Sequence, residues 1–204
     1  DQTRRQRQMC IRDRNNGVSN MPMKNSFHKN KFINSDLKDK YISVISICRF
    51  VRQKNINEIL NIAFKLPNLK FYIIGNGPLW PQINDLIKNK NLKNVSLLGE
   101  KKNIFKYLYK SDIYLSSSLY EGLPISILEA MSIGLPIVAS NVIGNCDTID
   151  HGKSGFLYEL HNENNAVYYL KKLSGNIDLI GKMGLSAFKL SLIHISEPTR
   201  LHVI

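Results

Sequence analysis

Cysteine is rare in this sequence, and the positions of the few cysteines exclude the common cysteine-based sites. The three cysteines, Cys10, Cys48 and Cys146, are far apart, with no CxxC pair. No paired histidines complete the ligand spacing of a zinc site. We therefore expect no disulfide framework and no metal, and a reducing, cytoplasmic compartment.

Long hydrophobic runs are absent as well. No stretch of about eighteen apolar residues occurs, and the N-terminus lacks the charged-then-apolar order of a signal peptide. The sequence therefore predicts neither a transmembrane span nor export. Peripheral attachment at the inner face of the cell membrane stays open.

Acidic residues are few relative to basic ones. Lys and Arg number 28 and Asp and Glu 16, which gives a net charge of +12. This excess favours anionic partners, such as nucleotides, nucleic acids or acidic membrane surfaces, without choosing among them. With 43% apolar residues, the 204-residue chain has a globular composition and the length for one domain with a sizeable core.

Arginine is nearly missing from the middle of the chain. Five of the eight arginines fall within residues 1–14, whereas residues 15–190 contain only Arg49 and Arg52 against twenty lysines. The start, 1–14, and the tail, 191–204, look like translated sequencing-adapter read-through, and the tail carries no element signal, so both are excluded from the fold prediction. Residues 15–40 are polar and without a firm period, which predicts a linker or hinge arm.

From Tyr41 onward, short β-branched runs alternate with longer helical periods. Strands are predicted at 41–48, 70–75, 94–99, 113–118, 136–140 and 155–158. Helices are predicted at 56–64, around 83–87, at 104–108, after Pro124, and twice within 162–190. This alternation predicts an α/β, doubly wound, Rossmann-like domain with a parallel sheet over residues 41–190. In such sheets, ligands bind beyond the carboxyl ends of the strands.

Basic residues and a glycine turn follow the first two predicted strands. Arg49 ends the first strand and Lys54 starts the next helix; two cations near outward N–H groups suit a diphosphate, and a solvated basic turn fits equally well. The turn Gly75–Pro78 is not a dinucleotide fingerprint, because Trp80 stands where the third glycine belongs. It predicts a tight turn that could let a nucleotide approach the backbone.

The stretch EGLPISILEA, residues 121–130, places two carboxylates eight positions apart. Since Pro124 suits a first helical turn, we expect a helix from near Leu123, with Glu121 in the loop before it and Glu129 one to two turns inside. An anion or a sugar hydroxyl could then bind the free N–H groups of Gly122, Leu123 and Ile125. A carboxylate such as Glu129 can hold ribose hydroxyls. An amphipathic helix with acidic ends explains the pattern at least as well.

The segment 141–156 is dense in Gly, Asn and Asp, which predicts turns. His151 lies in the middle of it. We interpret His151 as a surface turn residue rather than a catalytic base.

Four segments, taken together, resemble the donor-binding domain of a known enzyme family. This part of the chain resembles, in the order and spacing of its motifs, the C-terminal domain of GT-B glycosyltransferases of the retaining family 4 (group 1). The segments that carry the resemblance are ICRFVRQKN, IIGNGP, SSSLYEGLPISILEAMSIGLPIVAS and VIGNCDTIDHGKSGFLY. The similarity runs from about Asn15, where NNGVS is similar to the family's hinge motif, to about Leu190. It implies one half of a GT-B architecture, with the N-terminal acceptor domain missing.

The resemblance implies roles for the candidate residues. Arg49 and Lys54 would neutralise the diphosphate leaving group, Glu129 would hold the ribose, and Glu121 with the N–H groups after it would contact the sugar and β-phosphate. The loop that would hold the base contains Glu100, Asn103 and Ile104. Gly75 and Gly77 belong to the family's second-strand turn.

The resemblance also implies an activity. It is transfer of a sugar, with retention, from a nucleotide-diphosphate sugar, UDP being favoured, to a glycan or lipid-linked acceptor in bacterial capsule, O-antigen or exopolysaccharide synthesis. Neither metal nor cofactor is expected. The segment Ile143–Asp147 departs from the family's Gly-Gly-x-Pro-Glu loop and is nearer to a GNxD variant of capsule and O-antigen transferases, in which a basic residue is common at the position of Cys146. The fragment alone is expected to bind donor without turnover.

Two other readings compete with this one. A nucleotide-binding Rossmann domain without transferase activity is disfavoured by the missing GxGxxG and by the lack of an acidic residue after the second strand. A nucleic-acid-binding module is disfavoured because the lysines are scattered and no RNA-binding signature occurs. We therefore expect no nucleic-acid partner.

Overall fold

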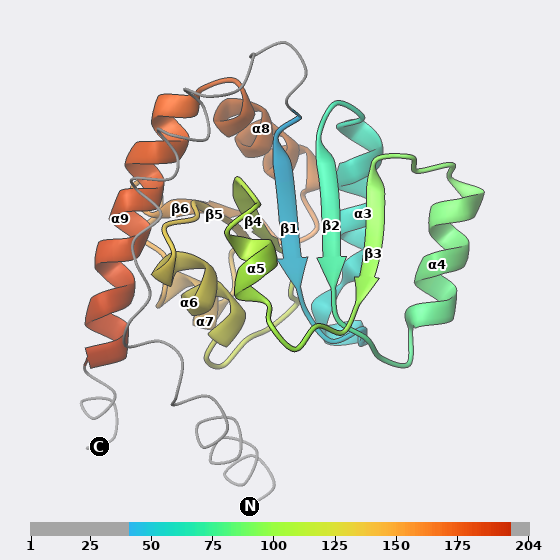
Figure 1. Cartoon of the computed structure of the whole chain (residues 1–204), viewed down its shortest axis with the longest axis horizontal. Coiled ribbons are helices and arrows are strands. Elements are labelled where there is room, and N and C mark those ends of the chain that lie inside the picture. The colour runs from blue at the N-terminus through green and yellow to red at the C-terminus, as the bar shows by residue number, and fades with distance from the viewer. Residues whose placement is uncertain (1–40, 197–204) are drawn as a thin grey trace, which may run out of the picture.

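The chain folds around one six-stranded parallel sheet. The computed structural model describes residues 41–196, so the predictions for residues 1–40 and 197–204 lie outside the described residues. The strand order is β3-β2-β1-β4-β5-β6 (Figure 1). The chain thus builds outward from β1 to β3, returns to place β4 beside β1, and builds outward again on the other side. This confirms the predicted doubly wound α/β fold.

The strands are short and the helices vary widely in length. The strands are β1 (Ser43–Ile47), β2 (Lys70–Ile74), β3 (Val95–Gly99), β4 (Ile113–Ser116), β5 (Ile137–Ser140) and β6 (Gly155–Tyr158). The helices are η1 (Arg52–Lys54), α3 (Ile56–Lys65), α4 (Trp80–Asn89), α5 (Phe105–Leu108), α6 (Ile125–Ser132), α7 (Ile143–Cys146), α8 (Glu163–Ser174) and α9 (Ile177–Ser196).

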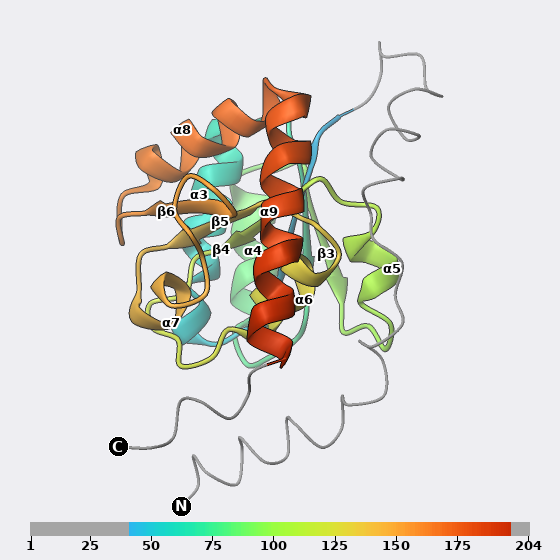
Figure 2. The same ribbon diagram turned by 90° about the vertical axis from the view of Figure 1, so that its left-hand side faces the viewer.

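Two hydrophobic clusters form, one on each face of the sheet. Neighbouring residues of β1 belong to different clusters, Val44 to one and Ile45 to the other, because side chains alternate along a strand. Residues of α3, α4 and α8 pack in the cluster of Val44, and residues of α5 and α6 pack in that of Ile45. Figure 2 shows these helices on opposite sides of the sheet. Burial on both faces explains why the strands read as nearly continuous apolar runs.

Each predicted strand is present, with ends that differ by no more than two residues. The expectation that no element extends into the tail was wrong, because α9 continues past Leu190 to Ser196. Ser191 is fully buried and α9 packs along α6, so helix propagation and packing extend the element where no cap or period marked it. A second miss is α7, four residues long, where only turns were predicted.

Glu58 on α3 is a buried carboxylate that should make stability depend on pH. It is 5% exposed, and Asn55 Nδ2 donates to its Oε2. Burial raises the pKa of Glu58, and the charge of Glu163 raises it further. The Tyr158 hydroxyl and His161 lower the pKa, but each by less than burial raises it. Since its folded pKa exceeds its unfolded value of about 4.3, ionisation costs stability above the folded pKa, and this cost disappears below about pH 4.

We therefore expect Glu58→Gln to raise the melting temperature at pH 7 by roughly 2–4 °C, about 1 kcal/mol, and to change it much less at pH 4. Thermal unfolding followed by circular dichroism at both pH values measures this. An equal shift at the two pH values, or a loss of stability at pH 7, would contradict the assignment.

Candidate functional site

A cleft of about 600 Å³ opens at the carboxyl ends of the strands, next to the point where the strand order reverses between β1 and β4. Its walls come from the segments that follow β1, β2 and β3, from the loop before α6, and from the first turns of α6. The lining residues are Ile47, Cys48, Arg49, Lys54, Ile74, Gly75, Asn76, Glu100, Lys101, Ile104, Glu121, Leu123, Pro124, Ile125, Ser126 and Glu129.

Most of the site residues predicted from the sequence line this one cleft. The ten that do so are Arg49, Lys54, Gly75, Glu100, Ile104, Glu121, Leu123, Pro124, Ile125 and Glu129. Gly77, Asn103 and Gly122 are not among the lining residues. Asn103 instead accepts at Oδ1 from the N–H of Lys106 (3.3 Å), at the start of α5. Six lining residues were missed: Ile47, Cys48, Ile74, Asn76, Lys101 and Ser126.

Some of the missed residues had a signal in the sequence. Cys48, Asn76 and Lys101 each stand at or just beyond a strand end, where the fold places ligands. Ser126 lies three residues before Glu129, and this spacing puts both on one face of α6.

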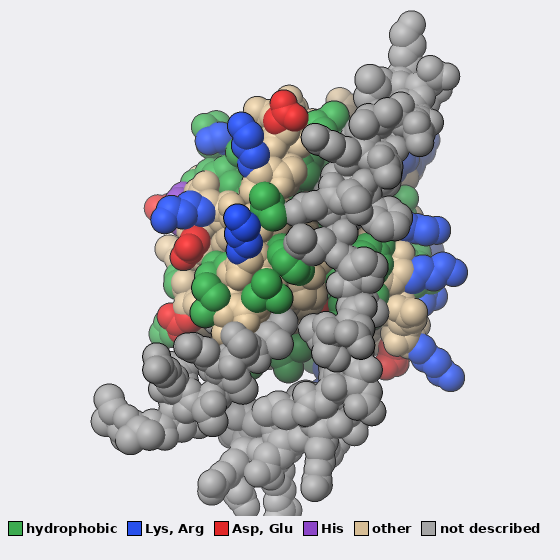
Figure 3. Space-filling model, turned by 60° about the vertical axis from the view of Figure 1, so that its left-hand side comes forward, with side chains coloured by type: hydrophobic (Ala, Val, Ile, Leu, Met, Phe, Trp, Pro, Cys, Tyr) green, Lys and Arg blue, Asp and Glu red, His purple; other side chains and the backbone are tan. Residues whose placement is uncertain are grey.

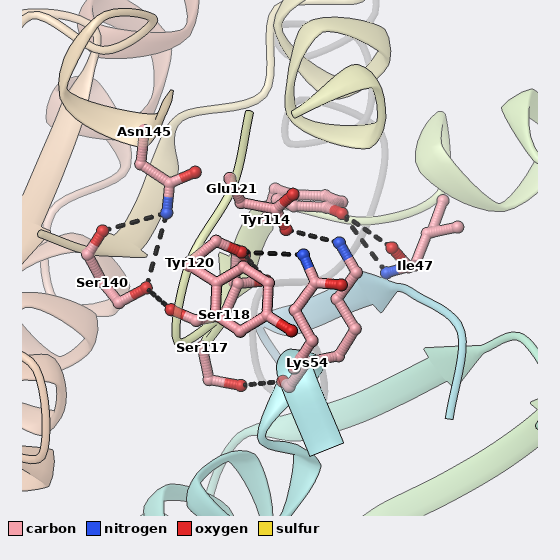
Figure 4. A network of polar contacts seen from close by, with 11 residues as sticks. Ile47, Lys54, Tyr114, Ser117, Ser118, Tyr120, Glu121, Ser140 and Asn145 are labelled. Atoms are coloured by element: carbon pink, nitrogen blue, oxygen red, sulfur yellow. Dashed lines mark hydrogen bonds and ion pairs between the residues drawn. The ribbon is translucent and has the colours of Figure 1, made fainter. Parts of the chain in front are cut away.

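Lys54 and Glu121 form an ion pair inside the cleft (Figure 4). The side chain of Lys54 is 21% exposed and that of Glu121 is 9% exposed. The two residues are 67 positions apart in the chain and follow the adjacent strands β1 and β4. Lys54 is therefore already partnered by a carboxylate, which the sequence had not indicated.

The segments that carry this pair are joined by further hydrogen bonds. The N–H of Leu119 donates to the carbonyl of Gln53 (2.8 Å), and Gln53 Nε2 donates to the carbonyl of Tyr120 (2.8 Å). The hydroxyl of Ser117 donates to the carbonyl of Lys54 (2.8 Å). Each of these bonds joins the η1 segment to the segment after β4, so the two segments that carry the ion pair are held together. Figure 4 shows the contact of Ser117 with Lys54.

The turn after β2 is shaped by backbone contact with the segment after β1. A Cβ at Gly75, where φ is +138°, would lie 1.9 Å from the carbonyl oxygen of Cys48, and a Cβ at Gly77 would lie 2.6 Å from that of Phe50. The N–H of Phe50 donates to the carbonyl of Asn76 (2.9 Å). Because both residues are glycines, the segment after β2 can contact the backbone of the segment after β1. Gly77 has this packing role and does not line the cleft.

Helix α6 begins later than predicted. Its first residue is Ile125, two residues after the expected start near Leu123, because Pro124 precedes it with a non-helical ψ of 77°. The N–H of Ile125, predicted to be free, donates to the carbonyl of Leu123 (3.0 Å). The turn before the helix therefore satisfies one of the N–H groups that the sequence assigned to a ligand.

Helix α7 supports the Glu121 segment from behind. A Cβ at Gly144 would lie 2.5 Å from the carbonyl oxygen of Gly122 and 2.7 Å from that of Glu121. Asn145 is buried, and its Nδ2 donates to the carbonyl of Ser140 (2.9 Å), as Figure 4 shows. The loop that differs from the family pattern thus packs against the backbone of the predicted site.

Cys48 lines the cleft near the ion pair. Burial raises the pKa of Cys48 to about 12; Lys54 lowers it and Glu121 raises it, both to a smaller extent. The thiol is therefore protonated at neutral pH and is a poor nucleophile. Burial likewise raises the pKa of Tyr114, whose hydroxyl donates to the carbonyl of Ile47 (3.1 Å), a residue that lines the cleft.

His151 lies at the surface, as predicted. Its Nδ1 accepts from the N–H of Leu157 (3.0 Å), and its ring contacts Phe156 and Tyr169. Within residues 41–196, no group of three or more His, Cys, Asp or Glu side chains is placed to hold a metal ion. In the same range, no helix combines the length and the apolar character needed to cross a membrane.

A second hollow, of about 440 Å³, lies between α9 and the segment before β6. It contains none of the predicted site residues. Its lysines are Lys153, Lys182 and Lys189, and its apolar residues include Leu179 and Met183. In Figure 3, the lysines on this side of the molecule stand among hydrophobic side chains rather than in one continuous basic stripe.

Known proteins resemble the chain over the region that builds the cleft. The family model for glycosyl transferases group 1 matches residues 28–183. The UDP-Gal:alpha-D-GlcNAc-diphosphoundecaprenol alpha-1,3-galactosyltransferase of Escherichia coli is 42% identical over 101 residues, 47% of this chain and 25% of that protein. The poly(ribitol-phosphate) alpha-N-acetylglucosaminyltransferase of Staphylococcus aureus is 35% identical over 147 residues, 69% of this chain and 30% of that protein.

Solved structures show the same fold. A crystal structure of a mutant of S. aureus TarM with fondaparinux, alpha-GlcNAc-glycerol and UDP has a TM-score of 0.72 and 30% identity, covering 81% of this chain and 35% of that one. Anabaena HepE with UDP and glucose has a TM-score of 0.71 at 18% identity, covering 84% and 48%, and shows the fold alone. Such neighbours are GT-B enzymes, so this sheet corresponds to one half of that architecture. The chain spans between about a quarter and two fifths of the length of the curated relatives it matches.

Proposed function

Because the chain belongs to the group 1 glycosyl transferases, we propose that its cleft binds the nucleotide diphosphate of a sugar donor, with a UDP-sugar favoured. The observation that carries this is that ten residues from separate segments, chosen from the sequence, line one cleft. The volume of about 600 Å³ lies within the range of about 300–1,000 Å³ usual for small-molecule sites.

The diphosphate would bind between the end of β1 and the start of α6. Arg49 is exposed at the mouth of the cleft and Lys54 lies further in. As the bond between the anomeric carbon and the phosphate oxygen breaks, charge grows on the leaving diphosphate, and both cations would stabilise it. Arg49 and Lys54 would thus stabilise the leaving diphosphate without a metal ion.

The nucleoside would bind along α6 and the segment after β3. Glu129, half-buried one turn into α6, would accept hydrogen bonds from the ribose hydroxyls. The base would contact Glu100 and Ile104. Glu121 would face the sugar and the β-phosphate from the loop before α6.

The relatives support the wider proposal. The E. coli protein is named for a UDP-Gal donor and a diphosphoundecaprenol-linked acceptor, and TarM was solved with UDP. By analogy, we propose retaining transfer to a glycan or lipid-linked acceptor in polysaccharide biosynthesis, at the cytoplasmic side of the membrane. Acceptor contacts would come from an N-terminal domain, so the present chain is expected to bind donor without turnover.

Calorimetric titration of the whole chain with UDP, GDP and ADP tests the proposal. We expect saturable binding of one of them, weakened roughly 10- to 100-fold by Glu129→Ala, because hydrogen bonds to a charged group contribute about 1.5–3 kcal/mol. Glu129→Ala should weaken the binding of the nucleoside alone by the same factor. Glu159→Ala, an exposed carboxylate that does not line the cleft, is the control and should bind normally. A folded chain that bound none of the three would contradict the proposal.

A further inference from the structure

The cleft is not the strongly basic site that a diphosphate by itself would favour. Three cations line it, Arg49, Lys54 and Lys101, and so do three carboxylates, Glu100, Glu121 and Glu129. Their formal charges cancel, although the chain as a whole carries +12. The carboxylate of Glu121 forms an ion pair with Lys54, the deeper of the two proposed phosphate ligands.

Glu121 cannot easily move away from Lys54. Its side chain is 9% exposed. The carbonyl of the preceding Tyr120 is held by Gln53, and the backbone of Glu121 and Gly122 rests against Gly144. A phosphate that reaches Lys54 must therefore lie close to a fixed negative charge.

The donor and the product of the proposed reaction differ in charge at this point. In a nucleotide sugar, the β-phosphate is esterified and carries one negative charge. In the free nucleoside diphosphate it is a terminal phosphate, which gains about one more charge at pH 7 because its second pKa is about 6. The sugar also offers hydroxyl donors that a carboxylate can accept.

We propose that Glu121, through its ion pair with Lys54, makes the cleft select the nucleotide sugar over the free nucleoside diphosphate, and so favours release of the product. This rests on the proposed donor function of the cleft. The extra negative charge of the terminal phosphate in the free diphosphate would lie close to the carboxylate of Glu121 and be repelled by it. In the nucleotide sugar that extra charge is missing, and the sugar hydroxyls can donate hydrogen bonds to the same carboxylate. A unit charge at about 5 Å, at an effective dielectric constant of roughly 40–80, corresponds to a selectivity on the order of tenfold.

The test compares UDP with UDP-glucose, titrated calorimetrically into the whole chain. If another base is preferred, the corresponding diphosphate and its glucose ester replace them. In Glu121→Gln, we expect UDP to bind about tenfold more tightly, and UDP-glucose to bind no more tightly than in the wild type. Glu121→Asp keeps the charge and should keep the wild-type preference.

Glu100→Gln is the matched control, since it removes one carboxylate from the same cleft at an exposed position. It should change both affinities by the same factor. The proposal is overturned if Glu121→Gln tightens both ligands equally, leaves their ratio unchanged, or weakens UDP. A wild-type chain that is folded but binds neither ligand refutes the donor function itself, a different result from bound ligands with an unchanged ratio.

Discussion

Lys54→Met is expected to weaken the binding of UDP about 100-fold while changing the binding of uridine by no more than about twofold. Charge-assisted hydrogen bonds from an ammonium to phosphate contribute about 1.5–3 kcal/mol. Removal of Lys54 also leaves the carboxylate of Glu121 facing the diphosphate without its partner, which adds repulsion. Titration of both ligands into the variant measures the contrast.

Two further variants separate the causes of this loss. Lys54→Met combined with Glu121→Gln removes the repulsion and should recover part of the affinity for UDP. Arg52→Met removes a cation of η1 that does not line the cleft, and it should leave UDP binding nearly unchanged. Equal losses for uridine and UDP in Lys54→Met would remove the diphosphate assignment.

Gly75→Ala is expected to be strongly destabilising, by about 3 kcal/mol or more, because strain at a disallowed φ and a backbone clash act together. At Gly75, φ is +138° and a Cβ would lie 1.9 Å from the carbonyl oxygen of Cys48. The N–H of Gly75 also donates to the carbonyl of Gly99 (3.0 Å), so a shift of this residue disturbs three strand ends. Urea unfolding followed by circular dichroism measures the loss.

Gly181→Ala is the matched control. Gly181 lies within α9, and a Cβ there would meet nothing within 4 Å. Alanine should therefore stabilise the helix by about 0.5–1 kcal/mol. If Gly75→Ala unfolded at the same urea concentration as the wild type, the close contact between the segments after β1 and β2 would be contradicted.

The sheet could be predicted from local patterns, because strands buried on both faces appear as apolar runs between breakers. KFYIIG and GFLY were found in this way, with bounds close to those of β2 and β6. The starts and ends of helices were less predictable. The ψ of Pro124 delays α6, and packing on α6 carries α9 to Ser196; neither effect has a signature in a short stretch of sequence.

The contents of the cleft could be predicted because parallel strands end at one edge, which brings Arg49, Glu100 and Glu121 together from distant segments. Their pairing could not be predicted. The contact of Lys54 with Glu121 spans 67 positions and depends on β4 lying beside β1. The support of Glu121 by Gly144 likewise depends on where a four-residue helix packs.

The location of the donor site is tested most directly by a nuclear magnetic resonance titration of UDP into the ¹⁵N-labelled chain. The account predicts saturable amide shifts concentrated in residues 47–54, 74–76, 100–104 and 121–129, the segments that line the cleft. Saturable binding with shifts concentrated instead in α8 and α9, and none in these segments, would contradict it.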